Sequence, residues 1–335
     1  MPKFLILRFS SIGDIVLTTP VTRCLKQQVK GAEVHYALKK NFADVLAHNP
    51  YTDKKFFLED DLTALIAELK KEKYDYIIDL HHNQRTFLIK QRLGVKSFSF
   101  NKLNFKKWLL VNLKINQLPN ISIVERYLET VKSFGVKNDG KGLDYFIAAE
   151  DESILQTLPE NFRNQYIAFV VGAKHFTKQL PAEKIISICQ KISLPVILLG
   201  GNEDVAKAEK IMQGFQPQAS NLKLQIISLC GKLTLNQSAA IIKHSQKVIT
   251  HDTGLMHIAA AFKKEIISVW GNTVPEFGMA PYYGGEQIPN TKFEIRNLKC
   301  RPCSKIGYEK CPLGHFKCMM LHDENEIADA ANQNL

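Results

Sequence analysis

The chain has 335 residues, of which 45% are hydrophobic and 23% charged, and its net charge at pH 7 is +11. This length fits two compact domains, and the composition is typical of a globular protein rather than a disordered one. The sequence has no apolar run of 18 residues, so it predicts no transmembrane helix. Arg8 interrupts the first apolar stretch and no cleavage site follows, so we expect no secretory signal and a cytoplasmic location.

Short apolar runs alternate with longer amphipathic stretches through the first half of the chain. Strands are predicted at residues 4–8, 33–37, 55–58, 74–80 and 96–100, and helices at residues 14–29, 42–47, 62–71, 86–93 and 121–134. Alternation of this kind predicts βαβ units, in which a parallel sheet carries helices on both faces.

A polar, turn-rich segment at residues 137–163 interrupts this pattern, after which the alternation restarts. Strands are then predicted at residues 166–171, 195–199, 225–229, 247–250 and 265–270, and helices at residues 182–192, 204–212, 235–244, 255–262 and 323–332. The sequence therefore predicts two doubly wound domains, at residues 1–155 and 164–320, followed by a terminal helix within residues 321–335.

Asp14 follows the first predicted strand and opens the next helix, within the segment Ser10-Ser11-Ile12-Gly13-Asp14. Ligands of such sheets bind beyond the carboxyl ends of the strands, where Asp14 could act as a general base. Gly13 would then permit a tight turn or the close approach of another molecule, next to Ser10 and Ser11. The structural alternative is that these residues only cap the helix, and spacing alone favours it.

A second polar turn, His251 to His257, lies between a predicted strand and a helix. Its residues Asp252, Thr253, Gly254 and Leu255 place unpaired backbone N–H groups at a helix N-terminus, which suits a phosphate. The alternative is that Asp252 or Thr253 merely caps the helix and that His257 is a packed core histidine.

Two further loops follow strands of the second half. Lys178 lies in the first of them and could neutralise a diphosphate, although an exposed loop lysine is the simpler interpretation. Gly200 and Gly201 lie in the second, where they would allow close approach of a ligand or would simply form a turn.

Four of the seven cysteines cluster near the end of the chain, at Cys300, Cys303, Cys311 and Cys318. The CxxC spacing suggests a small structural zinc site, while the alternatives are an inert packed loop or a cysteine pair that oxidises on purification.

Taken together, the motifs RFSSIGDIVLTTP, TKQLP, LLGGNED, HDTGLMHIAAA and SVWGNTVP resemble glycosyltransferase family 9, the ADP-heptose:lipopolysaccharide heptosyltransferases. The resemblance implies a GT-B fold, with two Rossmann-like domains facing across a cleft. The first domain would take the acceptor and the second the nucleotide sugar, and the terminal helix would pack back on the first domain.

The resemblance also implies residue roles. Asp14 matches the family's catalytic base in an inverting, metal-independent displacement, and Lys178 matches the lysine that holds the donor phosphates. Thr253, Gly254 and Leu255 match the backbone segment that binds the diphosphate. Leu180 stands where tryptophan is common in the family, which leaves the transferred sugar open.

The partners that follow are a nucleotide sugar, with ADP-heptose the first choice, and an anionic lipid-linked saccharide. The basic excess fits such an acceptor at the cytoplasmic face of the inner membrane, with Lys102, Lys106, Lys107 and Trp108 as candidates for peripheral contact. No nucleic-acid recognition motif occurs. Alternatives are a relative with another sugar donor, a non-catalytic nucleotide-sugar-binding protein, and a dinucleotide oxidoreductase, which the lack of GxGxxG disfavours.

Overall fold

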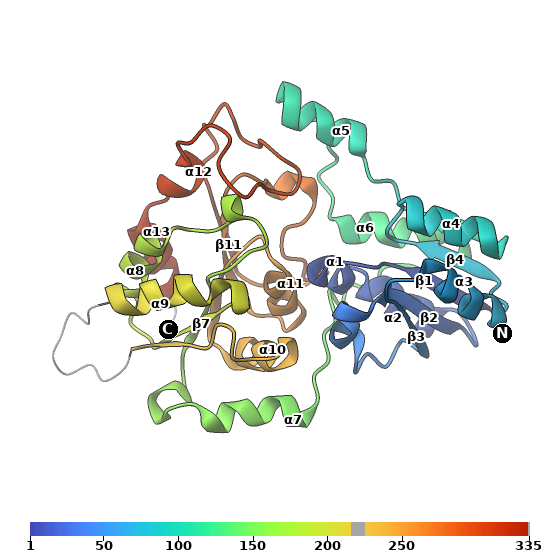
Figure 1. Cartoon of the computed structure of the whole chain (residues 1–335), viewed down its shortest axis with the longest axis horizontal. Helices are drawn as coiled ribbons and strands as arrows, with labels where there is room; N and C mark the ends of the chain where they lie inside the picture. The colour runs from blue at the N-terminus through green and yellow to red at the C-terminus, as the bar shows by residue number, and fades with distance from the viewer. Residues whose placement is uncertain (216–224, 334–335) are drawn as a thin grey trace. The chain divides into compact units, whose positions relative to one another are not determined.

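The computed structural model describes residues 1–215 and 225–333, and the chain divides into two compact units (Figure 1). The first unit contains Met1–Leu103, Ile121–Ile147 and Tyr282–Glu286, and the second contains Asn104–Asn120, Ala148–Pro281 and Gln287–Leu335. Each unit has its own parallel sheet with helices between the strands, which confirms the predicted α/β architecture. Among the described helices, none combines the length and apolar character that a bilayer crossing needs.

The sheet of the first unit has five parallel strands in the order β3-β2-β1-β4-β5. Their bounds are β1 Lys3–Leu7, β2 Glu33–Lys39, β3 Lys54–Leu58, β4 Tyr76–Asp79 and β5 Lys96–Ser99. Strand β1 is central, and its Phe4 pairs with Val34 on one side and Tyr76 on the other. The strand order reverses between β1 and β4, so this unit's ligand crevice is expected beyond the ends of those two strands.

Helices connect these strands and cover the sheet. They are α1 Ile12–Val16, α2 Thr19–Gln28, α3 Leu62–Lys71, α4 Gln84–Leu93 and α6 Ile123–Leu128, with 3₁₀ turns η1 Lys40–Leu46 and η3 Glu129–Phe134. The single helix predicted at residues 14–29 is wrong, because it divides into α1 and α2. Pro20 lies in the first turn of α2, where its missing N–H costs nothing, but it would break a continuous helix.

The sheet of the second unit has six parallel strands in the order β11-β10-β9-β6-β7-β8. Their bounds are β6 Ile167–Val170, β7 Val196–Leu199, β8 Ile226–Ser228, β9 Lys247–His251, β10 Glu265–Trp270 and β11 Asn290–Glu294. The strand order reverses between β6 and β9, so this unit's ligand crevice is expected beyond the ends of those two strands. Strand β11 was not predicted, since it is a half-exposed edge strand without a continuous apolar run.

The second unit carries more helical segments than the first. Its α-helices are α5 Asn104–Trp108, α7 Ala149–Glu152, α8 Ala182–Cys189, α9 Val205–Gly214, α10 Leu235–His244, α11 Gly254–Ala261, α12 Lys317–Met320 and α13 Glu324–Asn332. Short turns complete it: a π-helical turn η2 Leu109–Leu113 and 3₁₀ turns η4 Ser153–Thr157, η5 Glu160–Phe162, η6 Phe176–Lys178, η7 Asn202–Asp204 and η8 Pro275–Phe277.

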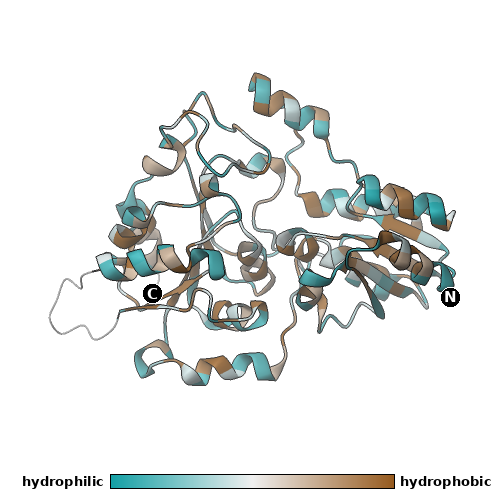
Figure 2. Ribbon diagram, viewed as in Figure 1, coloured by the Kyte–Doolittle hydropathy of each residue, from teal (hydrophilic) through white to brown (hydrophobic). Residues whose placement is uncertain are grey.

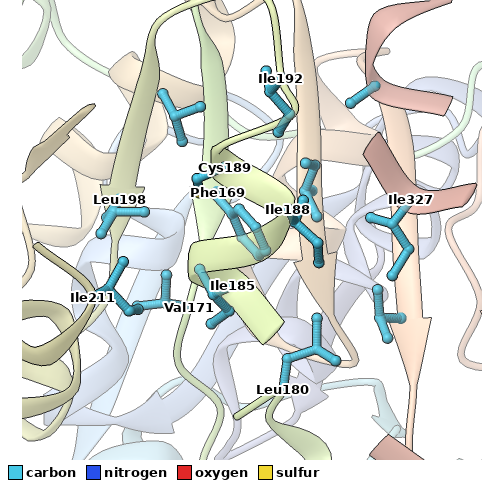
Figure 3. Packing of buried hydrophobic residues seen from close by; sticks show 14 of the residues in the cluster. Phe169, Val171, Leu180, Ile185, Ile188, Cys189, Ile192, Leu198, Ile211 and Ile327 are labelled. Atoms are coloured by element: carbon cyan, nitrogen blue, oxygen red, sulfur yellow. The ribbon is translucent and has the colours of Figure 1, made fainter. Parts of the chain in front are cut away.

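The terminal helix α13 packs within the second unit. Its return to the first domain stays a prediction. Its Ile327 is fully buried in the same apolar cluster as Phe169 of β6 and Ile188 of α8 (Figure 3). The Nδ2 of Asn332 also donates to the carbonyl of Lys191 at 2.9 Å. The apolar residues of α13 therefore complete the second core.

The predicted domain ranges of 1–155 and 164–320 also differ from the units of the structure. The chain passes from the first unit to the second after Ile147, and a later segment, Tyr282–Glu286, belongs to the first. The backbone N–H of Gly285 donates to the carbonyl of Gly140 at 2.8 Å, and a Cβ at Gly284 would lie 2.1 Å from that oxygen. A segment distant in sequence thus completes the first unit, which no local pattern indicates.

Candidate active site

The carboxylate of Asp14 lies in the first turn of α1, just beyond the end of β1. Its Oδ2 accepts hydrogen bonds from the backbone N–H and hydroxyl of Ser11, at 3.3 and 2.9 Å. Its Oδ1 forms a salt bridge with Nη2 of Arg8 at 2.6 Å, and the side chain remains 22% exposed. Asp14 therefore caps the helix, as the structural alternative predicted, while solvent still reaches the carboxylate.

Arg8 is the buried cation that holds this carboxylate in place. Its Nε donates to the carbonyl of Ser10 at 2.8 Å, and its Nη1 donates to the carbonyl of Leu80 at 2.7 Å and to the hydroxyl of Tyr127 at 3.1 Å. Burial opposes the charge, but Asp14 and Tyr127 outweigh it, so the pKa of Arg8 is raised above its ordinary value. The salt bridge therefore holds the Asp14 carboxylate beyond the end of β1, where a general base would lie.

His81 follows β4, on the other side of the switch point, and lies close to this pair. Its Nδ1 accepts from the backbone N–H of Phe9 at 3.3 Å. Burial, together with the charge of Arg8, lowers the pKa of His81 to about 4, so the ring is neutral at pH 7. The sequence reasoning missed His81, Arg8 and Tyr127, although the position of His81 directly after a central strand was a usable signal.

Ser10, Ser11 and Gly13 all contribute to this turn through their backbone. Ser11 is the N-cap of α1, and the carbonyl of Gly13 accepts from the N–H of Leu17 at 2.9 Å. Gly13 is buried within the helix and has no positive φ, so the tight-turn reason for a glycine does not apply. The close approach of an acceptor at Gly13 stays a prediction.

In the second unit, Lys178 and Asp252 form a salt bridge beyond the ends of the two central strands. Nζ of Lys178 lies 2.6 Å from Oδ2 of Asp252, and their side chains are 15% and 12% exposed. The hydroxyl of Thr273, which follows β10, donates to the same oxygen at 2.9 Å. The segments that follow three adjacent strands, β6, β9 and β10, thus each bring one polar side chain to a common point. The sequence indicated Lys178 and Asp252 as site residues but not Thr273.

Thr253 is the N-cap of α11, next to this salt bridge in sequence. Its hydroxyl accepts from the N–H of Met256 at 3.4 Å, and Gly254 and Leu255 form the first helical positions. The first N–H groups of a helix have no intrahelical partner, and together with the positive end of the dipole they suit an anion. With Lys178 near the same turn, this unit has the components of a phosphate site.

Two buried histidines flank that turn. The pKa of His251 is lowered to about 3 by burial and by the charge of Lys207, and its Nε2 accepts from the N–H of Leu180 at 2.9 Å. A neutral ring thus fixes the backbone just after Lys178, at the end of that loop. His257 is 2% exposed within α11, which agrees with the packed-histidine alternative, and its part in donor binding stays untested.

Gly200 and Gly201 lie beyond β7, beside a buried carboxylate. The N–H of Gly201 donates to Oδ2 of Asp204 at 2.9 Å, and a Cβ at Gly200 would come within 2.7 Å of that side chain. A Cβ at Gly172 would meet the same carboxylate at 1.9 Å. These contacts explain the glycines by internal packing, so their place in the donor site rests on the resemblance alone.

The four clustered cysteines are all free thiols. Sγ of Cys300 lies 3.8 Å from Nε2 of His315. Within residues 1–215 and 225–333, the group close enough to hold a metal ion is a different one, Glu33, His35 and Glu72, and Lys3 and Lys54 already neutralise its carboxylates. The predicted zinc site therefore rests on spacing alone.

Comparison with known proteins identifies the family. The model of glycosyltransferase family 9 (heptosyltransferase) matches residues 62–307. Lipopolysaccharide heptosyltransferase 1 of Campylobacter coli is 25% identical over 321 residues, which cover 89% of this chain and 92% of the relative. Lipopolysaccharide heptosyltransferase 1 of Escherichia coli K12 is 24% identical, with 85% and 92% covered.

Solved structures support the same fold. A family 9 glycosyltransferase from Veillonella parvula matches 98% of the chain and 96% of its own length, with a TM-score of 0.75 and 19% identity. The ADP-heptose lipopolysaccharide heptosyltransferase II of Escherichia coli matches with a TM-score of 0.73 and 16% identity, over 98% and 97%. The fold is therefore GT-B, and the family model includes Lys178 and Asp252 but begins after Asp14. With its motifs, its two parallel sheets and this match over most of its length, the chain belongs to glycosyltransferase family 9 and is a glycosyltransferase.

Proposed function

We propose that the protein transfers heptose from ADP-heptose to an inner-core lipopolysaccharide acceptor, with inversion at the anomeric carbon. Relatives named as lipopolysaccharide heptosyltransferases support heptose as the sugar and the lipopolysaccharide core as the acceptor. The observation that carries the proposal is the Lys178–Asp252–Thr273 group beside the N-terminus of α11, which has the charge and the backbone donors for a nucleoside diphosphate.

In the proposed reaction, Asp14 accepts the proton of the acceptor hydroxyl as its oxygen attacks the anomeric carbon. The new glycosidic C–O bond forms while the bond between that carbon and the β-phosphate oxygen breaks, and ADP leaves with the electron pair. Asp14 has to give up part of its contact with Arg8 or Ser11 when it takes the proton. That exchange links its basicity to the position of Arg8.

The second unit would stabilise the departing ADP. Negative charge on the β-phosphate rises as the bond breaks, and a lysine and a helix N-terminus placed there become more favourable in the transition state. Lys178 would exchange Asp252 for the phosphate, while Thr273 keeps the Asp252 carboxylate bonded. The chain's own groups therefore supply the stabilisation, without a catalytic metal.

The test is turnover of ADP-heptose with a heptose-deficient core acceptor, followed by ADP release, for the wild type and for Asp14→Asn. We expect kcat to fall by at least about 100-fold in the variant, because general base catalysis contributes roughly 10²–10⁴-fold. Ser11→Ala is the matched control, since it removes a hydrogen bond to the same carboxylate but not the base. Full turnover by a folded Asp14→Asn protein would refute the assignment.

The donor sugar is tested separately, by a panel of ADP- and UDP-sugars in the same assay. ADP-heptose should give the highest kcat/KM. A different preferred sugar would leave the glycosyltransferase chemistry intact and identify this chain as a relative with another donor.

A further inference from the structure

The stretch between Asp79 and Glu125 contains no acidic residue at all. It contains eight basic residues: Arg85, Lys90, Arg92, Lys96, Lys102, Lys106, Lys107 and Lys114. These eight account for most of the net charge of +11, so the remainder of the chain is close to balanced. The positive charge is therefore concentrated in one part of the sequence, of which residues 104–120 belong to the second unit and the rest to the first.

Among the described residues, the same stretch also contains many of the large apolar side chains that are exposed. Its exposed apolar side chains are Phe87, Leu88, Phe105, Trp108, Leu113, Ile115 and Ile121. Four of them lie in residues 104–115, which belong to the second unit and include α5 and the π-helical turn η2. Phe105 is 70% exposed and Trp108 is 49% exposed, although aromatic side chains of this size are normally covered.

One side of residues 104–115 is anchored to the second unit. Leu110 is buried with Val274 and Phe277 in a small apolar cluster. Nζ of Lys114 donates to the carbonyls of Cys300 and Pro302, at 3.2 and 2.7 Å. The segment is thus a fixed element with a free outer side, rather than a loose loop.

The outer side combines aromatic and cationic groups. The rings of Phe105 and Trp108 stack with centroids 6.4 Å apart and planes inclined by 10°. Lys106 and Lys107 lie between them in the sequence, and Figure 2 shows hydrophobic and hydrophilic residues mixed along α5. Aromatic rings prefer the headgroup level of a bilayer, and lysines beside them pair with anionic headgroups.

We propose that residues 104–115 form a docking surface for an anionic lipid bilayer. Phe105 and Trp108 enter the headgroup region and Lys106 remains among the lipid phosphates. Lys107 joins Lys106 by leaving the ring of Phe277, whose centroid lies 5.8 Å from its Nζ. Charge complementarity selects this occupant, because residues 104–115 contain three lysines and no carboxylate. The inference rests on the proposed function in one respect: a lipid-linked acceptor would be presented at such a surface.

The chain provides its own optical probe, because it contains only two tryptophans. Trp270, the last residue of β10, is fully buried, whereas Trp108 is half-exposed. Vesicles of phosphatidylglycerol and phosphatidylethanolamine should therefore shift the Trp108 emission to shorter wavelength, and vesicles of phosphatidylcholine should not. Trp108→Phe should abolish the shift and retain vesicle binding, which co-sedimentation measures.

Two double variants separate the contributions. Lys106→Gln/Lys107→Gln should weaken binding to the anionic vesicles by about fivefold per lysine, and added salt should reduce wild-type binding toward the variant level. Phe105→Ser/Trp108→Ser should weaken it by at least about tenfold. Leu321→Ser and Lys132→Gln are the controls, since both residues are exposed outside the acid-free stretch.

These measurements use no sugar donor or acceptor, so they are independent of the transfer reaction. Asp14→Asn should bind vesicles like the wild type even though its sugar transfer is strongly reduced. The docking proposal is overturned if the wild type does not bind the anionic vesicles at physiological salt, or if both double variants bind like the wild type. A change of oligomeric state in the double variants without lipid would overturn it as well, and would identify a protein interface instead.

Discussion

Nζ of Lys178 lies 2.6 Å from Oδ2 of Asp252, although the two residues are 74 positions apart in the sequence. They follow β6 and β9, the two strands between which the order of the second sheet reverses. The fold therefore places a cation at the point where parallel sheets of this kind bind ligands, and it supplies a carboxylate that balances the charge. A diphosphate that binds there competes with Asp252 for the same ammonium group.

Lys178→Gln should weaken binding of ADP by about 10–100-fold, because a hydrogen bond from a charged group contributes about 1.5–3 kcal/mol. The loss of affinity should be larger for ADP than for AMP, since only ADP carries the second phosphate group. Isothermal titration with both nucleotides measures this difference. Lys174→Gln, an exposed lysine of the same loop, is the matched control and should bind like the wild type. Equal affinity of Lys178→Gln and wild type for ADP would exclude Lys178 from the phosphate site.

Arg8→Gln should lower kcat by about tenfold or more and change its pH dependence. The guanidinium lies 2.6 Å from Asp14, and without it the carboxylate is protonated more easily. The acidic limb of the pH–rate profile should therefore move to higher pH, whereas a purely structural defect would lower the rate equally at every pH. Arg8→Lys, which retains a charge but not the fork of donors, should show an intermediate shift. An unchanged profile would show that Arg8 does not act through Asp14.

Stability should fall as the pH decreases from about 6.5 to about 4. Burial lowers the pKa of His81 to about 4, that of His251 to about 3 and that of His322 to about 4. The unfolded chain binds these protons near pH 6.5 and the folded chain does not, so unfolding takes up protons throughout this interval. The free energy of unfolding should therefore decrease by roughly several kcal/mol across it.

Urea denaturation at pH 7.5, 6.0 and 4.5 measures that decrease. His251→Asn should reduce the slope of stability against pH, whatever its effect on stability at pH 7.5, because one titrating group is removed. His48→Asn, a change at an exposed histidine, should leave the slope unchanged. A slope in His251→Asn equal to that of the wild type would contradict the assignment.

The strands can be predicted from the sequence more readily than the assignment of chain segments to the two units. Apolar runs such as residues 166–171 and 265–270 have no favourable place except a buried parallel strand, so pattern and structure agree there. Strand β11 has mixed polarity because it lies at an edge, where one side remains exposed. The assignment of Tyr282–Glu286 to the first unit depends on contacts with residues near Gly140, and such tertiary contacts leave no periodic signal.

The candidate site was predictable to the extent that its residues directly follow strands. Asp252 directly follows β9, whereas Asp14 and Lys178 lie in the segments that connect β1 and β6 to the next helices. Polar residues in those segments stand out from their apolar surroundings. Arg8 is different, because a cation at the end of a buried strand has no visible partner until the fold brings it to Leu80 and Tyr127. Thr273 is an ordinary threonine in the sequence, and only its distance to Asp252 distinguishes it.

Ile327→Ala tests whether α13 is part of the second core. The side chain of Ile327 is fully buried among residues of the second unit's sheet and helices. Removal of three buried carbon atoms should therefore reduce the free energy of unfolding by about 2–5 kcal/mol. Glu326→Ala, at the exposed neighbouring position, should change it by less than about 0.5 kcal/mol. The defect lies in the unit that carries Lys178, so ADP binding should protect Ile327→Ala against denaturation. If Ile327→Ala were as stable as the wild type, α13 would contribute nothing to this core.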